Sequence, residues 1–426
     1  MKKKCTGLAK TCLVLAVILL SFGCTKKKTS VFVPRLSPNM QGTVTIAGNY
    51  ANFEALEAEF DRFNEYYPEI ALSFEFLDNY NASIRAAIKT EAAPDIYWTF
   101  SWMVDKPEYS GLFELAENLA DPKLDINLSA IRQELLYHHQ NGQVLMAPIV
   151  TNTFGMLVNN DLFKKYNIPI PKTYDDLKKA CLDFKEKGYD TPILGYNNQR
   201  GLFQFFTLPY FCQSISTIPG SVPMLNALLP EAGKYLKPVL EATEDLVASG
   251  LINFESCKTL KNDYNALIMR FFEGDIPIVF SSAELVSGTK KREKQSQTFI
   301  QQPFSYSFHP IPVGKKGRIF LNMSSIDFSV NKNSPNLEIA NEFMRFLLTE
   351  EELNTISRNK RLVTVSTDYS FDDIYKAFSD ATPVYFEWVG IMDNAIKQFR
   401  SAVWHVGNGK MTSEEAMSQF GSLPEK

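Results

Sequence analysis

The sequence is poor in the residues and motifs that mark catalytic and metal sites. Its 426 residues include 4 histidines and 6 cysteines, and their spacing matches neither a zinc site nor a disulfide framework. It contains no Gly-x-Ser-x-Gly elbow and no glycine-rich phosphate loop. Its formal net charge of −4 gives no electrostatic basis for binding nucleic acid. We therefore expect no cofactor, no metal site and no nucleic-acid partner.

The N-terminus has the pattern of a targeting segment. Lysines at positions 2–4 precede the apolar run Cys12–Phe22, which is too short to span a bilayer comfortably. The run ends at Leu20-Ser21-Phe22-Gly23-Cys24, which resembles a bacterial lipoprotein box and implies acylation of Cys24. An ordinary secretory signal cut near Gly23 is the alternative. We predict a signal peptide over residues 1–23 and a tether over residues 24–41, which have no apolar periodicity.

The cysteines other than Cys24 give little information about function. Cleavage before Cys24 leaves Cys181, Cys212 and Cys257 as the other cysteines, an odd number once Cys24 is acylated. Cys181 falls on the apolar face of a predicted helix, so we expect it in the core.

After residue 42 the chain alternates between strand and helix patterns. Apolar residues alternate at 44–46 and 70–76, and they recur at helical spacing across Asn52–Tyr67. Such a unit has parallel strands and a right-handed crossover, and a helix near 83–91 and a strand at Ile96–Thr99 extend it. An open parallel sheet leaves a crevice at the carboxyl ends of its strands. The candidate ligand contacts at those ends are Asn49, Tyr50, Asn79, Tyr80, Ser101 and Trp102.

The stretch Asn141–Phe163 predicts a crossing between two packed units. Two apolar runs, Val144–Val150 and Phe154–Val158, are separated by a polar joint that contains Asn152. The alternative is two neighbouring core strands of a single domain. We include Asn152 among the candidate ligand contacts because it lies at this joint.

Several motifs together resemble the extracellular solute-binding proteins of the maltose-binding type. The crossing is similar to that family's "DGK … YN-x-D-LF" segment, with Asn141-Gly142-Gln143 in place of Asp-Gly-Lys. Pro171–Leu177 is similar to "P-x-T-W-x-E-L", and Phe272–Val279 to "F-x-x-G-x-x-A-M". The resemblance covers most of Thr43–Gln419 through the order and spacing of these motifs.

The resemblance implies an α/β fold of the periplasmic-binding-protein type. Each of two lobes would hold a mainly parallel sheet flanked by helices, and hinge crossings would join the lobes. Residues 42–150 with 310–360 would form the first lobe, and residues 154–306 with 361–426 the second.

The second part of the chain adds further candidate contacts. Phe203 belongs to an aromatic run, Glu284 follows a strand at a position where many relatives have Gly and Trp, and Asn322 lies in a polar cluster on the return to the first lobe. Tyr385 and Trp388 open a late segment that resembles the family's aromatic-bearing cleft helix.

These features predict a lipid-anchored extracytoplasmic receptor that passes a solute to the permease of an ABC importer. The mixture of aromatic rings, amides, hydroxyls and carboxylates favours a sugar, since pyranose faces stack on rings and hydroxyl groups need polar partners. The carboxylates are too many for their spacing to exclude a glycosidase pair. A secreted glycan-cleaving enzyme and a surface interaction protein without a small ligand therefore stay open as alternatives.

Overall fold

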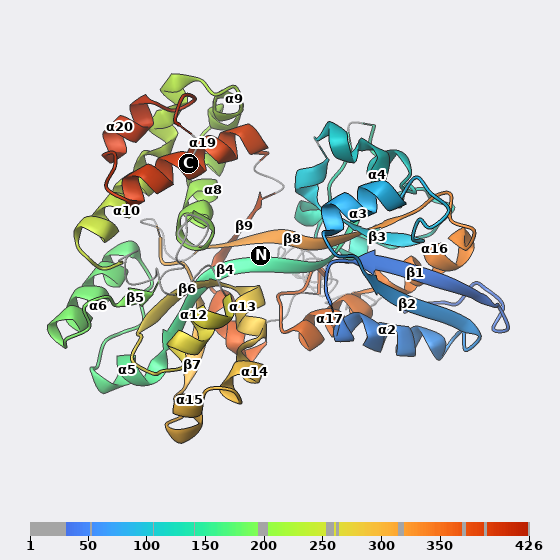
Figure 1. Cartoon of the computed structure of the whole chain (residues 1–426), viewed down its shortest axis with the longest axis horizontal. Coiled ribbons are helices and arrows are strands. Elements are labelled where there is room, and N and C mark those ends of the chain that lie inside the picture. Colours follow the sequence, from blue (N-terminus) through green and yellow to red (C-terminus); the bar gives the residue numbers. More distant parts are fainter. Residues whose placement is uncertain are drawn as a thin grey trace, which may run out of the picture.

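The structure is a computed structural model that describes residues 31–51, 53–104, 106–139, 141–194, 203–252, 260, 264–313, 319–368, 372–386 and 390–424. The predicted signal peptide, Cys24, Cys257 and Trp388 lie outside these residues. Figure 1 shows two groups of elements joined by two long strands, β4 (Ala147–Asn159) and β8 (Ile319–Val330).

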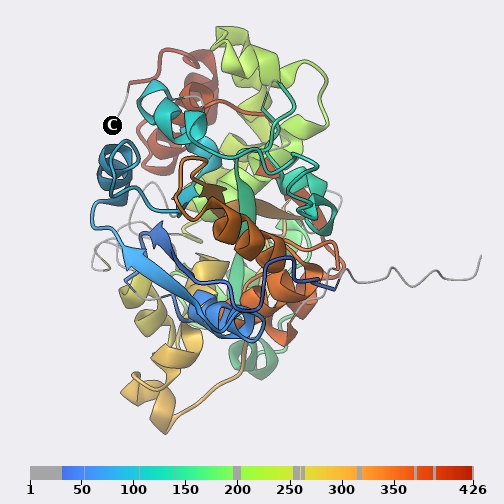
Figure 2. The same ribbon diagram turned by 90° about the vertical axis from the view of Figure 1, so that its right-hand side faces the viewer.

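The first half, at the right of Figure 1, comprises a small sheet, the helices that cover it and the segments between β3 and β4. Its strands are β1 (Gly42–Gly48), β2 (Ile70–Phe76) and β3 (Ile96–Thr99). Its α-helices are α2 (Glu54–Asn64), α3 (Tyr80–Ala87), α4 (Ser110–Glu114), α16 (Leu337–Leu347) and α17 (Glu350–Lys360), and its short 3-10 turns are Ser101–Met103, Pro107–Tyr109, Leu128–Ala130 and Gln133–Leu135. Figure 2 shows α2, in blue, beside the orange helices α16 and α17.

The second half, at the left of Figure 1, is richer in helices. Its strands are β5 (Ile193–Leu194), β6 (Ile278–Ser282), β7 (Tyr306–Pro310) and β9 (Thr382–Tyr385). Its helices are α5 (Asn160–Lys165), α6 (Tyr174–Glu186), the π-helix Phe203–Thr207, α8 (Leu208–Ser216), α9 (Ser221–Asn226), the 3-10 helix Pro230–Leu236, α10 (Lys237–Ala248), α12 (Tyr264–Phe271), α13 (Ala283–Ser287), α14 (Thr289–Glu293), α15 (Gln297–Gln301), the 3-10 helix Asp373–Phe378, α19 (Asp393–Gly407) and α20 (Ser413–Ser418).

One mixed sheet connects the two halves. Neighbouring strands follow the order β2-β1-β3-β8-β4-β6-β5, with β7 beside β4 and β9 beside β8. β1 is parallel to β2 and β3, as the βαβ pattern predicts, and β5 is parallel to β6. β4 and β8 instead pair antiparallel with each other, and they add the antiparallel pairs β3–β8, β4–β6 and β4–β7. The sheet is therefore less uniformly parallel than we expected.

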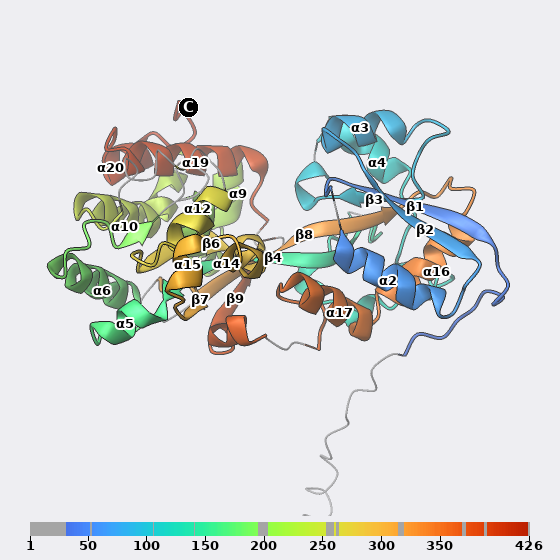
Figure 3. The same ribbon diagram turned by 60° about the horizontal axis from the view of Figure 1, so that its bottom comes forward.

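The crossing is a single strand, which corrects the prediction of two strands separated by a polar joint. β4 has 13 residues and passes through Thr151, Asn152 and Thr153. The Thr151 hydroxyl donates to the Val363 carbonyl at 2.6 Å, and the Thr153 hydroxyl donates to the Leu321 carbonyl at 2.7 Å. Because these two hydroxyls have backbone partners, polar residues are buried here without ending the strand. Figure 3 shows β4 and β8 side by side between the halves.

Strand β8, on which the chain returns toward the first half, contacts both halves. β8 pairs with β3, where Ile96 lies opposite Val330, and with β9, where Asn322 lies beside Tyr385. Helix α16 packs against β1 and α2 of the first half. The exact residue boundaries of the two predicted lobes stay a prediction.

Local sequence patterns correctly predicted the starts of two helices. Thr173 and Asp176 form the predicted capping box of α6, and Thr412 and Glu415 form that of α20. Cys181 is buried, as expected for a core residue, and Cys212 is also buried. None of the helices in the described part of the chain is both long and apolar enough to cross a membrane.

Candidate functional site

The parallel strands of the first half end at one edge of the sheet, where Tyr50 follows β1. Its ring makes edge contacts with Trp98 at 4.8 Å and with Phe53 at 5.3 Å between centroids. These contacts hold the phenol ring in place, while its neighbour Asn49 is exposed. A rigid ring at a strand end is suited to stacking against a flat apolar ligand face.

Two charged residues from distant parts of the chain act on Tyr50, one by contact and one through its charge. The Lys360 Nζ, at the end of α17, lies 4.5 Å from the centroid of the Tyr50 ring. Burial raises the pKa of the Tyr50 phenol, and the negative charge of Glu284 raises it further. Burial lowers the pKa of the Lys360 ammonium, and the charge of Glu284 opposes that change. Glu284, at the start of α13, also accepts a hydrogen bond from the Ser325 hydroxyl at 3.0 Å.

This cluster brings together Tyr50 from the first half and Glu284 from the second, both of which were predicted as ligand contacts. It adds Lys360, which the sequence analysis missed. Lys360 ends an ordinary amphipathic helix, so no local pattern distinguishes it from other surface lysines. Only the packing of α17 beside α2 carries it to the end of β1.

Trp102 lies in a second cluster at the same edge, with 42% of its surface exposed. Its ring stacks on Phe100 at 5.9 Å with 15° between planes, and Tyr109 contacts it edge-on at 5.3 Å. The Lys106 Nζ is 4.7 Å from the ring centroid and 3.7 Å from Asp393 Oδ2, at the start of α19. Lys106 and Asp393 were also missed, because each is an ordinary charged residue at a helix end.

Asn152 presents a free acceptor between the halves. Its Oδ1 atom is buried and has no hydrogen-bond partner among the described residues. A buried polar atom without a partner costs about 1–3 kcal/mol, so a hydrogen bond to this oxygen from a ligand would remove that cost. Asn152 is therefore a predicted contact with an unsatisfied hydrogen-bond acceptor.

Asn322 lies on the opposite face of the same strand pair. It is fully buried, and neither of its amide atoms has a partner in the described part of the chain. Asn322 is opposite Thr153 in the β4–β8 ladder, and adjacent strand residues point to opposite faces. Asn322 and Asn152 therefore face different sides, so the structure does not bring them into one site.

Tyr385 shares the face of Asn322. Its hydroxyl accepts a hydrogen bond from Arg132 Nη1 at 3.3 Å, and the guanidinium lies 5.6 Å from its ring centroid. Tyr385 also lines a pocket of about 550 Å³ beside residues of α8 and α9. Tyr385 therefore contacts Arg132 of the first half on the face of the strands that carries Asn322.

The other predicted contacts of the first half differ in their surroundings. Asn79 is exposed and left-handed, with φ of 46°, and Ser101 is half-buried. Tyr80 is a core residue in this structure, because its ring is buried and its hydroxyl donates to the Trp98 carbonyl at 2.6 Å. The helix starts at Tyr80 and not near Ser83, which turns the ring toward the sheet.

Two predicted contacts cannot be placed. Trp388 and the side chain of Phe203 lie outside the described residues. Phe205 and Phe206, from the same aromatic run as Phe203, are buried in the core, and Phe206 stacks on Phe280 at 5.1 Å.

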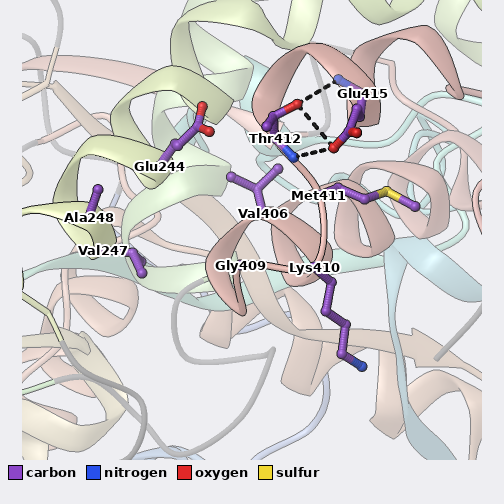
Figure 4. A pocket seen from close by; sticks show the side chains of 9 residues that line it. All are labelled: Glu244, Val247, Ala248, Val406, Gly409, Lys410, Met411, Thr412 and Glu415. Atoms are coloured by element: carbon purple, nitrogen blue, oxygen red, sulfur yellow. Dashed lines mark hydrogen bonds between the residues drawn. The ribbon is translucent and has the colours of Figure 1, made fainter.

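A smaller pocket of about 310 Å³ lies within the second half, between α10, α19 and α20 (Figure 4). Its wall includes Val406 and the capping box of α20, in which Thr412 and Glu415 bond to each other. It contains none of the predicted contacts. No group of three or more potential metal-ligating side chains is found in the described ranges.

Comparisons with known proteins agree with this architecture. A family model described as "Bacterial extracellular solute-binding protein" matches residues 47–353. The melibiose/raffinose/stachyose-binding protein MelE of Bacillus subtilis (strain 168) is 29% identical over 181 residues, 41% of this chain and 39% of that protein. The match thus spans about two fifths of MelE.

Solved structures show the same fold. Apo RafE from Streptococcus pneumoniae superimposes with a TM-score of 0.70 at 14% identity, over 91% of this chain and 99% of RafE. A Bacillus licheniformis sugar transporter structure in complex with stachyose gives a TM-score of 0.61 at 17% identity, over 90% of this chain and 100% of that one. The predicted α/β fold of the periplasmic-binding-protein type is confirmed. Since the family model covers most of the sequence, the chain belongs to the bacterial extracellular solute-binding protein family.

Proposed function

We propose that this protein is a lipid-anchored receptor that binds an oligosaccharide between its two halves and delivers it to an ABC importer. The observation that carries the proposal is the cluster of Tyr50, Lys360 and Glu284, which come from both halves and combine an aromatic ring with a donor and an acceptor. Trp102 and the unpartnered Asn152 oxygen add a second ring and a further acceptor.

This composition suits a sugar better than an apolar or a strongly charged solute. A pyranose ring presents apolar faces to aromatic side chains and hydroxyl groups to polar ones. Contacts from both halves would stabilise a closed arrangement when the ligand is present. The names of MelE and of the stachyose complex describe sugars as ligands of those relatives, which supports the same class here.

The family consists of solute-binding proteins, so the chain is a binding protein and not a glycan-cleaving enzyme. The anchor and the importer are further parts of the proposal. The lipoprotein-like sequence at Gly23-Cys24 supports the anchor. The extracellular role described for the family supports an extracytoplasmic location and a permease partner.

Titration of the purified protein with melibiose, raffinose, stachyose and mannobiose tests the ligand class. We expect saturable heat of binding and a raised thermal midpoint with at least one of them, since a ligand that binds the folded state stabilises it. Saturable binding of a peptide or an amine, with no response to any saccharide in a broad panel, would overturn the sugar assignment. Absence of every ligand-dependent change would favour the interaction protein.

A further inference from the structure

One lysine of the first half contacts both the exposed tryptophan and an acid of the second half. Lys106 lies just before the 3-10 turn Pro107–Tyr109. Its Nζ is 4.7 Å from the centroid of the Trp102 ring and 3.7 Å from Asp393 Oδ2. Asp393 is the first residue of α19, which belongs to the left-hand group in Figure 1. A single ammonium group therefore bridges the two halves beside a candidate stacking surface.

The contacts of Trp102 differ in how easily another group could displace them from the indole ring. Phe100 stacks on the indole and Tyr109 contacts it edge-on, and Tyr109 is itself buried. These aromatic rings are attached to ordered backbone and hold the indole. Lys106 has a long, flexible side chain, so its ammonium can leave the ring without any movement of the backbone.

We propose that Lys106 competes with the ligand for Trp102. In the ligand-free protein its ammonium covers the indole, and a sugar ring that stacks there displaces it. This inference rests on the proposed function, because it takes Trp102 as a stacking surface for a sugar. A partly exposed cation–π contact and a partly exposed ion pair are both weak, so the ligand can displace them. Their loss subtracts from the binding free energy, and Lys106 therefore lowers affinity.

The surroundings of Asp393 favour the displacement of Lys106 from Trp102. Lys397, one turn further along α19, lies 3.2 Å from the same Asp393 oxygen. When Lys106 leaves, the carboxylate keeps a cationic partner within its own helix. Salt screens contacts between exposed charges. Higher ionic strength should therefore release Lys106 and strengthen the binding of a neutral sugar.

The variant Lys106→Met tests the proposal, since it keeps a long side chain and removes the charge. In the ligand-free protein we expect acrylamide to quench Trp102 emission about twofold more strongly, with Trp102→Phe defining the signal of that residue. We expect raffinose affinity to rise about three- to tenfold, the scale of one weak ion pair with one cation–π contact. The salt dependence of affinity should disappear in the variant.

Lys397→Met is the matched control, because it removes a cation from the same carboxylate without touching Trp102. Its quenching and raffinose affinity should stay within about twofold of the unmodified protein. Unchanged quenching in Lys106→Met, or weaker raffinose binding by it, would overturn the competition. If no saccharide binds the unmodified protein, the proposed function fails, while the quenching comparison still decides whether Lys106 covers the indole.

Discussion

At the scale of single residues, the two asparagines of the central strands have similar surroundings but different expected roles. Asn152 and Asn322 both lie in the β4–β8 ladder and both have buried amide atoms without partners in the described part of the chain. They point to opposite faces of the strand pair. We propose that Asn152 contacts the ligand and that Asn322 does not, a distinction that composition alone does not make.

The first prediction compares these asparagines. Asn152→Ala should lower the affinity for the bound saccharide about tenfold, since one hydrogen bond contributes about 1 kcal/mol or more. Its ligand-free thermal midpoint should not fall, because the Oδ1 atom that is removed has no partner. Asn322→Ala is the control and should leave affinity unchanged. Calorimetric titration checks both, and equal losses in the two variants would contradict the assignment.

A second residue-scale prediction concerns Asp327, a buried carboxyl of β8. Burial raises its pKa to about 7, and the hydroxyl of Ser324, which donates to Oδ2 at 2.6 Å, partly opposes that rise. The folded protein therefore holds this proton to higher pH than the unfolded chain does. The contribution of Asp327 to the free energy of unfolding should therefore fall as pH rises from about 4 to 7, by up to about 1.4 kcal/mol per pH unit.

The variant Asp327→Asn removes that titration. Urea unfolding at pH 8 should show the variant to be more stable than the unmodified protein, and the difference should vanish near pH 4. Asp95→Asn is the control, since the Asp95 carboxylate accepts from the Thr45 backbone N–H at 2.7 Å and from the Ser334 hydroxyl. That change should destabilise the protein. A variant of Asp327 that is less stable at pH 8 would refute the argument.

At the scale of elements, β4 depends on close contact with its neighbour β7. Gly155 pairs with Pro310, and a Cβ atom at position 155 would collide with the backbone carbonyl of His309 and contact the ring of Phe308. A backbone atom cannot move aside as a side chain can. The glycine is therefore required by packing between strands, and the chain before and after it continues as one strand.

The third prediction follows from that contact. Gly155→Ala should destabilise the protein by roughly 1–3 kcal/mol, the usual scale of overpacking. Gly111→Ala is the control, because the added Cβ there would contact only the flexible end of the Lys89 side chain. Urea unfolding measures both free energies. Equal free energies of unfolding for the two variants would contradict the prediction, because they would show that β7 can move to accommodate the added methyl group.

At the scale of the whole molecule, weak polar contacts beside the two aromatic clusters tie the second half to the rest of the protein. The Ser325 hydroxyl of the connecting strand β8 donates to Glu284, and Lys106 of the first half pairs with Asp393. Each is a weak, partly exposed contact. Such contacts allow the halves to separate and close again, as a receptor that loads and releases a solute requires.

The fourth prediction concerns the proposed membrane anchor of the whole molecule. Cys24→Ala should release the protein from membranes or block its processing, because the proposed lipid is attached through that thiol. Cys12→Ala, within the predicted leader, is the control and should leave the anchor intact. Fractionation with and without detergent checks the result. Detergent-dependent membrane association that persists in Cys24→Ala would rule out this anchor.

Local patterns in the sequence were enough to locate several elements and to point to the family. Helical and alternating periodicities located α2, β1 and β2, and capping boxes located the starts of α6 and α20. These features depend on neighbours within a few residues, through backbone hydrogen bonds and side-chain spacing, so they can be recognised without the fold. The order of the motifs along the chain identified the family in the same way.

The tertiary structure decided which of the predicted residues share a site. Strand register placed Asn152 and Asn322 on opposite faces, and the start of α3 at Tyr80 put that ring in the core. The packing of α17 brought Lys360 to Tyr50. Contacts of this kind join segments far apart in the chain, and they depend on register and helix packing that no local pattern specifies.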